Sequence, residues 1–133
     1  MKTDDYVKTQ ERRINKEIKN LKKVMQDVPE DLLTAADGLI KRAAFMRITL
    51  EDYEEDLTKM GHTEMFTQSV NTDPYERERP TARLHISMAK NYQTTMQRLF
   101  ELIPKKPADP VDPTYAKFFG GSNGSPQASS GGV

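Results

Sequence analysis

The sequence predicts a mostly α-helical fold in which long helices pack as a helical hairpin or bundle. Apolar residues recur at alternating steps of four and three along two long stretches, which places them on one face of a helix. A glycine and several turn-forming residues then interrupt the pattern, which indicates a short β-hairpin or irregular insert. From residue 104 onward the chain is rich in proline, glycine and serine, and we expect a disordered tail there.

The composition limits the chain to one small domain with a thin core. It has 133 residues, of which 35% are hydrophobic and 30% are charged. One domain is expected at this length, and a chain this polar buries little surface by itself. We therefore expect the protein to bury further surface against copies of itself as a homo-oligomer.

The sequence also indicates a cytoplasmic protein with no membrane partner. It contains no cysteine, which fits a reducing compartment. No apolar run reaches the roughly 20 residues that a membrane helix needs. No apolar segment follows the first residues, so no signal peptide is expected.

Residues 1–27 are predicted to form an N-terminal basic helix, from about residue 4 to residue 26. The net charge of the chain is zero, but residues 1–28 carry eight Lys and Arg against five Asp and Glu. Residues 29–60 reverse the balance, with four basic and eight acidic residues. Only the first segment therefore offers a basic surface. Its apolar face consists of Ile14, Ile18, Leu21, Met25 and Val28.

Residues 28–103 are predicted to form the helical oligomerisation core. Its first helix should run continuously from about residue 28 to residue 60, because the four-three alternation continues for four heptads. Asp27 is expected to cap its start. The residues expected to mediate oligomerisation along this seam are Leu32, Leu39, Met46, Leu50, Tyr53 and Leu57.

Gly61 is expected to end that helix, and residues 62–73 form the insert. The segment Asn71-Thr72-Asp73-Pro74 is expected to make a turn. Pro80 then favours a new helix over residues 80–103. Two apolar stripes run along this last helix, one through Ile86 and Phe100 and the other through Tyr92 and Leu99.

The order of these features resembles the small terminase subunit family of tailed bacteriophages. The resemblance covers about residues 28–104 and rests on a long helix ended by Gly61, a short insert, the turn ending in Pro74, and the closing Leu99-Phe100-Glu101-Leu102-Ile103-Pro104. It implies a ring-like homo-oligomer, of about eight to ten subunits, that engages double-stranded viral DNA when packaging begins in the host cytoplasm. It also implies a large terminase subunit as partner, which carries the ATPase and the nuclease, so that this chain catalyses nothing itself.

With that resemblance, the basic stretch of the first helix becomes the candidate DNA-binding site, because phosphate contacts need cations spaced along one surface. The candidates are Lys8, Arg12, Arg13, Lys16, Lys19, Lys22 and Lys23. The alternative is a solvated helix face whose cations pair with Glu11, Glu17 and the acidic residues of the second helix. The corresponding alternative function is a coiled-coil structural adaptor that binds protein partners only; a small transcriptional regulator is a third interpretation.

The tail, residues 104–133, contains one aromatic cluster. Tyr115, Phe118 and Phe119 are candidates for docking to the large subunit, because aromatic side chains in a tail can anchor in a groove of a partner. The alternative is that they fold back on their own oligomer.

Other chemistry finds little support in the sequence. Two histidines, His62 and His85, stand without a cysteine or a nucleophile motif, and no phosphate-binding glycine loop is present. The acidic run from Glu51 to Asp56 lacks a loop that could fold around a cation, and Glu55 is expected to pair with Lys59. We expect neither a metal nor a cofactor.

Overall fold

The computed structural model describes residues 1–105. These residues form a mostly helical fold with a small β-hairpin, which confirms the predicted class. The elements are α1 (Asp4–Val24), α2 (Glu30–Ala35), α3 (Asp37–Met60), β1 (Thr63–Phe66), β2 (Tyr75–Glu78) and α4 (Pro80–Glu101). The predicted tail beyond residue 105, with Tyr115, Phe118 and Phe119, lies outside the described residues.

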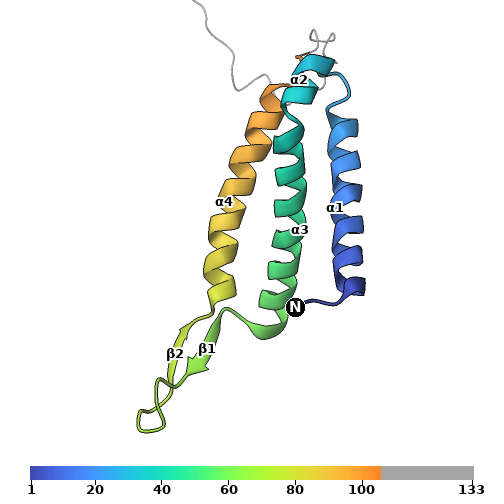
Figure 1. Cartoon of the computed structure of the whole chain (residues 1–133). Coiled ribbons are helices and arrows are strands. Elements are labelled where there is room, and N and C mark those ends of the chain that lie inside the picture. Colours follow the sequence, from blue (N-terminus) through green and yellow to red (C-terminus); the bar gives the residue numbers. More distant parts are fainter. Residues whose placement is uncertain (106–133) are drawn as a thin grey trace, which may run out of the picture.

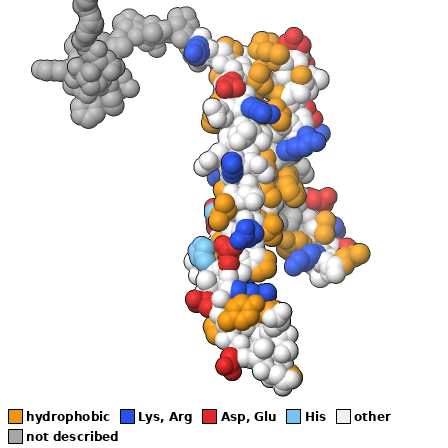
Figure 2. Space-filling view, turned by 90° about the vertical axis from the view of Figure 1, so that its left-hand side faces the viewer, with side chains coloured by type: hydrophobic (Ala, Val, Ile, Leu, Met, Phe, Trp, Pro, Cys, Tyr) orange, Lys and Arg blue, Asp and Glu red, His pale blue; other side chains and the backbone are white. Residues whose placement is uncertain are grey.

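The three long helices lie side by side, with α3 in the middle (Figure 1). α3 packs against α1 on one flank and against α4 on the other, whereas no extensive contact joins α1 to α4 directly. Because only α3 is covered on two sides, much apolar surface of the outer helices meets solvent. Figure 2 shows this on the side that α4 covers, where hydrophobic side chains reach the surface between basic ones.

The main core lies toward the α2 end of the helices. Its buried residues are Leu21, Met25, Val28, Ala36, Ile40, Ala43, Ala44 and Leu99, all at most 5% exposed. These residues come from α1, α3, α4 and the loops next to α2, so the core ties the whole layer together at one end. Small alanines on α3 let the neighbouring helices approach closely, and the larger Met25, Ile40 and Leu99 fill the space between them.

The predicted continuous helix over residues 28–60 is wrong, because the chain breaks at Ala36. Ala36 ends α2 and also precedes α3, with backbone angles of φ −86° and ψ −1°. Asp37 and Gly38 follow it, and both residue types are weak helix formers. The short α2 therefore turns away from the axis of α3 (Figure 1). Pro29 occupies the N-cap position of α2, where its side chain makes no capping hydrogen bond.

The insert is an antiparallel β-hairpin that projects beyond the helices (Figure 1). Gly61 ends α3 as predicted, with φ at +81°. The hairpin extends further than the expected residue 73, because β2 occupies Tyr75–Glu78 and pairs Phe66 with Tyr75 at its outer end. The rings of these two residues meet edge to face, with centroids 5.8 Å apart, and Arg77 stacks over the Phe66 ring.

Within residues 1–105, none of the helices has both the length and the apolar character needed to cross a membrane.

Candidate nucleic-acid interface

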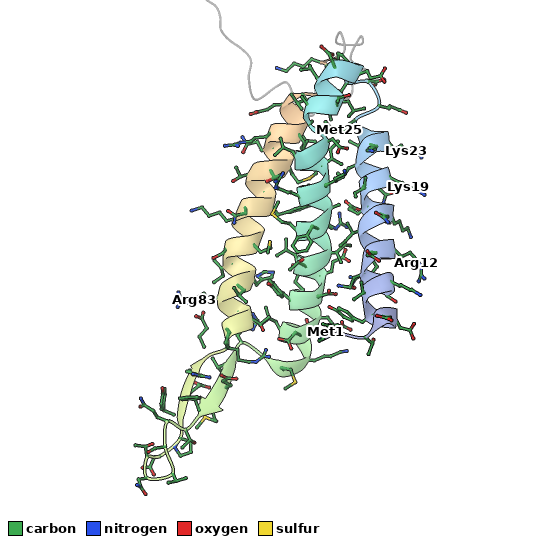
Figure 3. All side chains as sticks on the ribbon, in the orientation of Figure 1. Met1, Arg12, Lys19, Lys23, Met25 and Arg83 are labelled. Carbon is green, nitrogen blue, oxygen red and sulfur yellow. The ribbon has the colours of Figure 1, made fainter. Side chains whose placement is uncertain are left out.

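Five of the seven predicted DNA-binding residues form a strip along the outer side of α1, which we call the basic strip. It consists of Lys8, Arg12, Lys16, Lys19 and Lys23. Figure 3 shows Arg12, Lys19 and Lys23 on the side of α1 that faces away from α3. The strip lies there because the opposite side of the helix carries Ile14, Ile18 and Leu21, which pack into the core.

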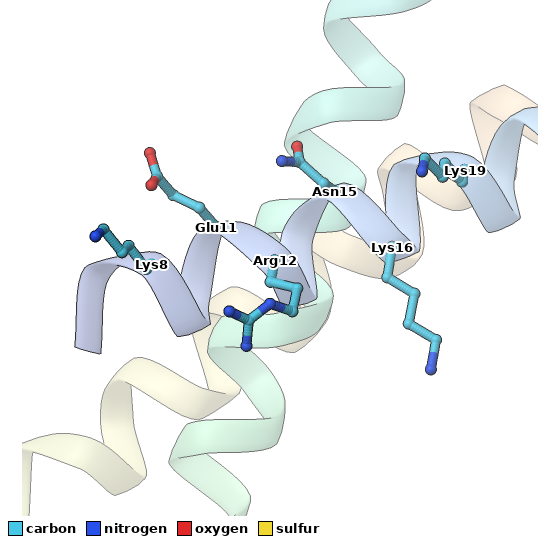
Figure 4. A pocket seen from close by; sticks show the side chains of 6 residues that line it. All are labelled: Lys8, Glu11, Arg12, Asn15, Lys16 and Lys19. Carbon is cyan, nitrogen blue, oxygen red and sulfur yellow. The ribbon is translucent and has the colours of Figure 1, made fainter. Parts of the chain in front are cut away.

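The basic strip is long enough to contact several phosphates. Lys8 and Lys23 are fifteen residues apart, which corresponds to about 22 Å along a helix axis. The first four members line an open depression of about 410 Å³ (Figure 4). Glu11 and Asn15 also line it and add one acidic and one neutral polar group (Figure 4). A strip of this length and sign suits the phosphate backbone of a nucleic acid.

Arg13, by contrast, faces α3 and is partly buried. Its Nη1 lies 2.7 Å from Oδ1 of Asp52, and its Nη2 lies 3.1 Å from Oε1 of Glu51. The same guanidinium also donates to the side-chain oxygen of Gln10 at 2.7 Å. The hydrogen bond to Asp52 is the largest cause that raises the pKa of Arg13 above its ordinary value. This residue joins α1 to α3 and is not free to meet a phosphate.

Lys22 is the second exception among the seven candidates. Its Nζ lies 3.7 Å from Oδ1 of Asp37, which also pairs with Lys41 at 3.0 Å. For Arg13 and Lys22, pairing with the acidic residues of the second predicted helix is therefore what the structure shows.

The acidic residues of α3 pair with residues outside the basic strip. Beyond the pairs of Arg13 and Lys22, the ion pairs of α3 include Glu51 with Arg47, Glu55 with Lys59 and Asp56 with Arg79, and Glu54 lies within hydrogen-bond distance of His85, at 3.0 Å. On α1, Glu17 pairs with Arg47 of α3. Among residues 1–105, no ion pair involves any of the five strip cations. Their charge is therefore available to an external anion.

A second group of basic residues, around the start of α4, is neutralised within the fold. Arg77 pairs with Glu64 across the hairpin, and Arg83 pairs with Glu78. Arg79 pairs with Asp56, as described above. In the described part of the chain, no group of His, Asp and Glu side chains is arranged to hold a metal ion.

The predicted oligomerisation seam is partly used within the chain. Leu50 and Leu57 are buried, and Leu39, Met46 and Tyr53 are partly buried. Leu32 lies on α2 and is 43% exposed. Since α4 already covers much of this seam, a second copy of the chain would meet other apolar residues as well. The role of the seam between copies stays a prediction.

A groove between α1 and α4, floored by α3, was not predicted from the sequence. We call it the α1–α4 groove; it is lined by Leu21, Val24, Arg47, Tyr92, Met96 and Phe100. On the α4 side it widens into a hollow of about 760 Å³ that extends to Lys105. The two apolar stripes of the last helix could have indicated this groove. The stripe through Tyr92 and Leu99 faces α3, and Phe100 of the other stripe then faces the groove.

Comparison with known proteins gives no match. No family model, no curated protein and no solved structure is similar to this chain.

Proposed function

We propose that this protein is a non-catalytic DNA-binding subunit of a homo-oligomer and acts as the small terminase subunit of a tailed bacteriophage. In that role it engages double-stranded viral DNA in the host cytoplasm when packaging begins. It then recruits and regulates the large terminase subunit, which carries the ATPase and the nuclease.

The observation that carries the proposal is the unpaired basic strip on α1. Five cations lie on one exposed side of α1, and none of them has an ion-pair partner within residues 1–105. The acidic residues of α3 are instead paired with other residues. A surface that keeps a run of unneutralised cations attracts polyanions, and release of counterions from DNA then drives the binding.

The open helical layer supports the oligomeric part of the proposal. Large apolar side chains remain about half exposed on both outer helices and on α3, among them Val24, Phe45, Leu84 and Phe100. Exposed apolar surface of this kind is typical of interfaces between proteins. In a ring of about eight to ten copies, the basic strip would repeat around the axis, so modest contacts would add up through avidity.

The family resemblance supports the phage assignment. A glycine ends the long helix, a hairpin follows, and a last helix closes before Pro104, in the order that the resemblance implies. The docking of Tyr115, Phe118 and Phe119 to the large subunit remains part of this proposal, since these residues lie outside the described part of the chain.

The proposal is tested by DNA binding at several salt concentrations. We expect the affinity for linear double-stranded DNA to fall steeply with salt, with a log–log slope of about 0.9 per phosphate contact. The test variant replaces three strip cations, by Lys16→Gln, Lys19→Gln and Lys23→Gln. It should bind DNA more weakly, and its salt slope should be smaller by the amount expected for about three phosphate contacts. The matched control removes the same charge elsewhere, by Lys41→Gln, Lys59→Gln and Lys90→Gln.

Equal losses in the two triple variants would mean that only net charge matters, and the basic strip would then not be the site. The mass of the native particle, measured with and without DNA, tests the oligomer separately. A large defined particle that takes up DNA at low salt is expected.

The coiled-coil adaptor remains the alternative function, because the same exposed apolar side chains would also suit protein partners. It predicts a dimer or tetramer that ignores DNA at all salt concentrations. A transcriptional regulator would bind DNA but would not bind the large terminase subunit.

A further inference from the structure

We propose that the aromatic segment Tyr115–Phe119 of the same chain binds in the α1–α4 groove. This surface and its occupant are independent of the basic strip, so the inference goes beyond DNA binding.

Large apolar side chains line both walls of the groove, Glu17 and Asn20 add polar groups on the α1 wall, and no described residue occupies it. Val24 on the α1 wall is 53% exposed, and Phe100 on the α4 wall is 52% exposed. Tyr92 and Met96 lie between them and are partly buried. Aromatic rings and a thioether favour aromatic partners, because sulfur–aromatic and ring–ring contacts add to the burial of apolar area.

The chain leaves the described structure at this groove. Lys105, the last described residue, lines the wide α4 side of the hollow together with Phe100 and Glu101. The segment that follows therefore begins beside the groove, at a high effective concentration of about millimolar order.

The connecting segment has a suitable length. Nine residues, 106–114, separate Lys105 from Tyr115. They can span at most about 32 Å. The part of the groove wall from Tyr92 to Phe100 measures about 12 Å along α4. The aromatic segment can therefore reach the whole groove of its own chain without strain.

The charges of the segment and the groove are complementary. Lys117 stands between the aromatic residues of the segment, and Glu101 on the groove rim has no ion-pair partner within residues 1–105. On the floor, Arg47 is held by Glu17 and Glu51 and is still about half exposed. A guanidinium in that position can stack on an aromatic ring, as Arg77 stacks on Phe66 in the hairpin.

If the segment also docks to the large subunit, a consequence that rests on the proposed function, then the groove and the large subunit compete for it. The large subunit would have to withdraw the segment before binding it. The test below needs neither DNA nor the large subunit, so its outcome is separate from that of the proposed function.

The experiment uses tryptophan as a unique reporter, because the natural chain contains none. In the full-length Phe118→Trp protein, we expect blue-shifted emission and protection from acrylamide. Adding Phe100→Asp should shift the emission to the red and raise the quenching constant severalfold. The matched control is Phe45→Asp, since Phe45 is 53% exposed but points away from the groove on the other side of α3. Circular dichroism checks that both variants remain folded.

A disulfide distinguishes the groove of the same chain from that of a neighbouring copy. The chain has no cysteine, so Gln97→Cys on the groove wall and Ala116→Cys in the segment provide one defined pair. We expect oxidation to form an intramolecular bond, seen as a faster monomer on a denaturing gel. Phe45→Cys with Ala116→Cys is the control and should not form one.

Three results would overturn the proposal. They are equal quenching after Phe100→Asp and after Phe45→Asp, disulfides that form only between chains, or emission typical of a fully exposed tryptophan in the Phe118→Trp protein itself.

Discussion

The guanidinium of Arg79 lies 2.8 Å from the carboxylate of Asp56, which joins the residue that precedes α4 to the last turns of α3. Asp56 Oδ2 is buried and lies directly against the Arg79 guanidinium. The same guanidinium donates to the carbonyl oxygen of Gly61 at 2.9 Å, and the Arg79 backbone N–H donates to the carbonyl oxygen of His62 at 2.9 Å. One residue thus fixes how the hairpin leaves the helical layer.

Acid is expected to weaken the fold through Asp56. The Arg79 guanidinium is the main cause that lowers the pKa of Asp56 below its ordinary value. Such a carboxyl adds stability that is complete above its unfolded pKa, about 3.9, and is lost as the pH falls through the lower folded pKa. Asp56→Asn should therefore lower the melting temperature at neutral pH, and the difference from the natural protein should vanish in strong acid.

Thermal unfolding of both proteins across that pH range measures the effect. Glu55→Gln is the control, because Glu55 makes only an exposed pair with Lys59 within α3 and should change little. A difference for Asp56→Asn that stays constant at every pH would show that the residue acts through packing.

The sequence predicted what depends on helical periodicity and on single special residues. The faces of α1 and α4 and the glycine that ends α3 belong to this class, because each follows from local chemistry. The break at Ala36 was missed because Leu32 and Ala36 keep the four-three spacing of apolar residues across it. That spacing alone does not indicate where a helix ends. β2 was missed because Tyr75–Glu78 is polar and exposed, and its strand character comes from pairing with β1.

The candidate site was predicted in outline but not in detail. Spacing alone could not separate Arg13 from Arg12, since both are basic and adjacent in the sequence. Their difference depends on tertiary structure: Arg13 faces Asp52 on α3, whereas Arg12 faces away from it.

Arg13 is expected to contribute to stability and not to DNA binding. Arg13→Gln removes its two ion pairs with α3, and the loss should be about 1 kcal/mol, at the upper end for partly exposed pairs. The affinity for DNA should stay close to that of the natural protein. Arg12→Gln, the neighbouring control on the basic strip, should lower the affinity for DNA and leave the stability nearly unchanged. Chemical denaturation and DNA titration of both variants check this, and a large loss of DNA affinity in Arg13→Gln would contradict it.

The core should depend on Leu99 far more than on Leu84, the other leucine of α4. Leu99 is fully buried in the main core, whereas Leu84 is 52% exposed. Leu99→Ala should lower the free energy of unfolding by about 2–5 kcal/mol, through lost burial and a cavity that neighbours fill only in part. Leu84→Ala should change it by less than about 0.5 kcal/mol. Urea unfolding of both proteins measures this, and a comparable loss for Leu84→Ala would reveal that this face of α4 is buried between copies.

Replacing Gly61 and Gly38 by alanine should change the free energy of unfolding in opposite directions. Gly61 has φ at +81° and ψ at 178°, a region that is essentially restricted to glycine. An added Cβ meets no atom within 4 Å, yet Gly61→Ala should cost about 1–3 kcal/mol from backbone strain alone.

Gly38 lies in the first turn of α3 with ordinary helical geometry, and an added Cβ there meets only Nη1 of Arg42, at 3.1 Å. This atom is the far end of a flexible side chain that can move aside, so Gly38→Ala should raise the free energy of unfolding by up to about 1 kcal/mol. Urea unfolding of the two variants provides the comparison. If Gly38→Ala also destabilised the protein, the hydrogen bond from Arg42 to the Gly38 carbonyl would be holding the start of α3 at its break. If Gly61→Ala cost nothing, the end of α3 would be free to adopt another conformation, and the hairpin would not be fixed by that turn.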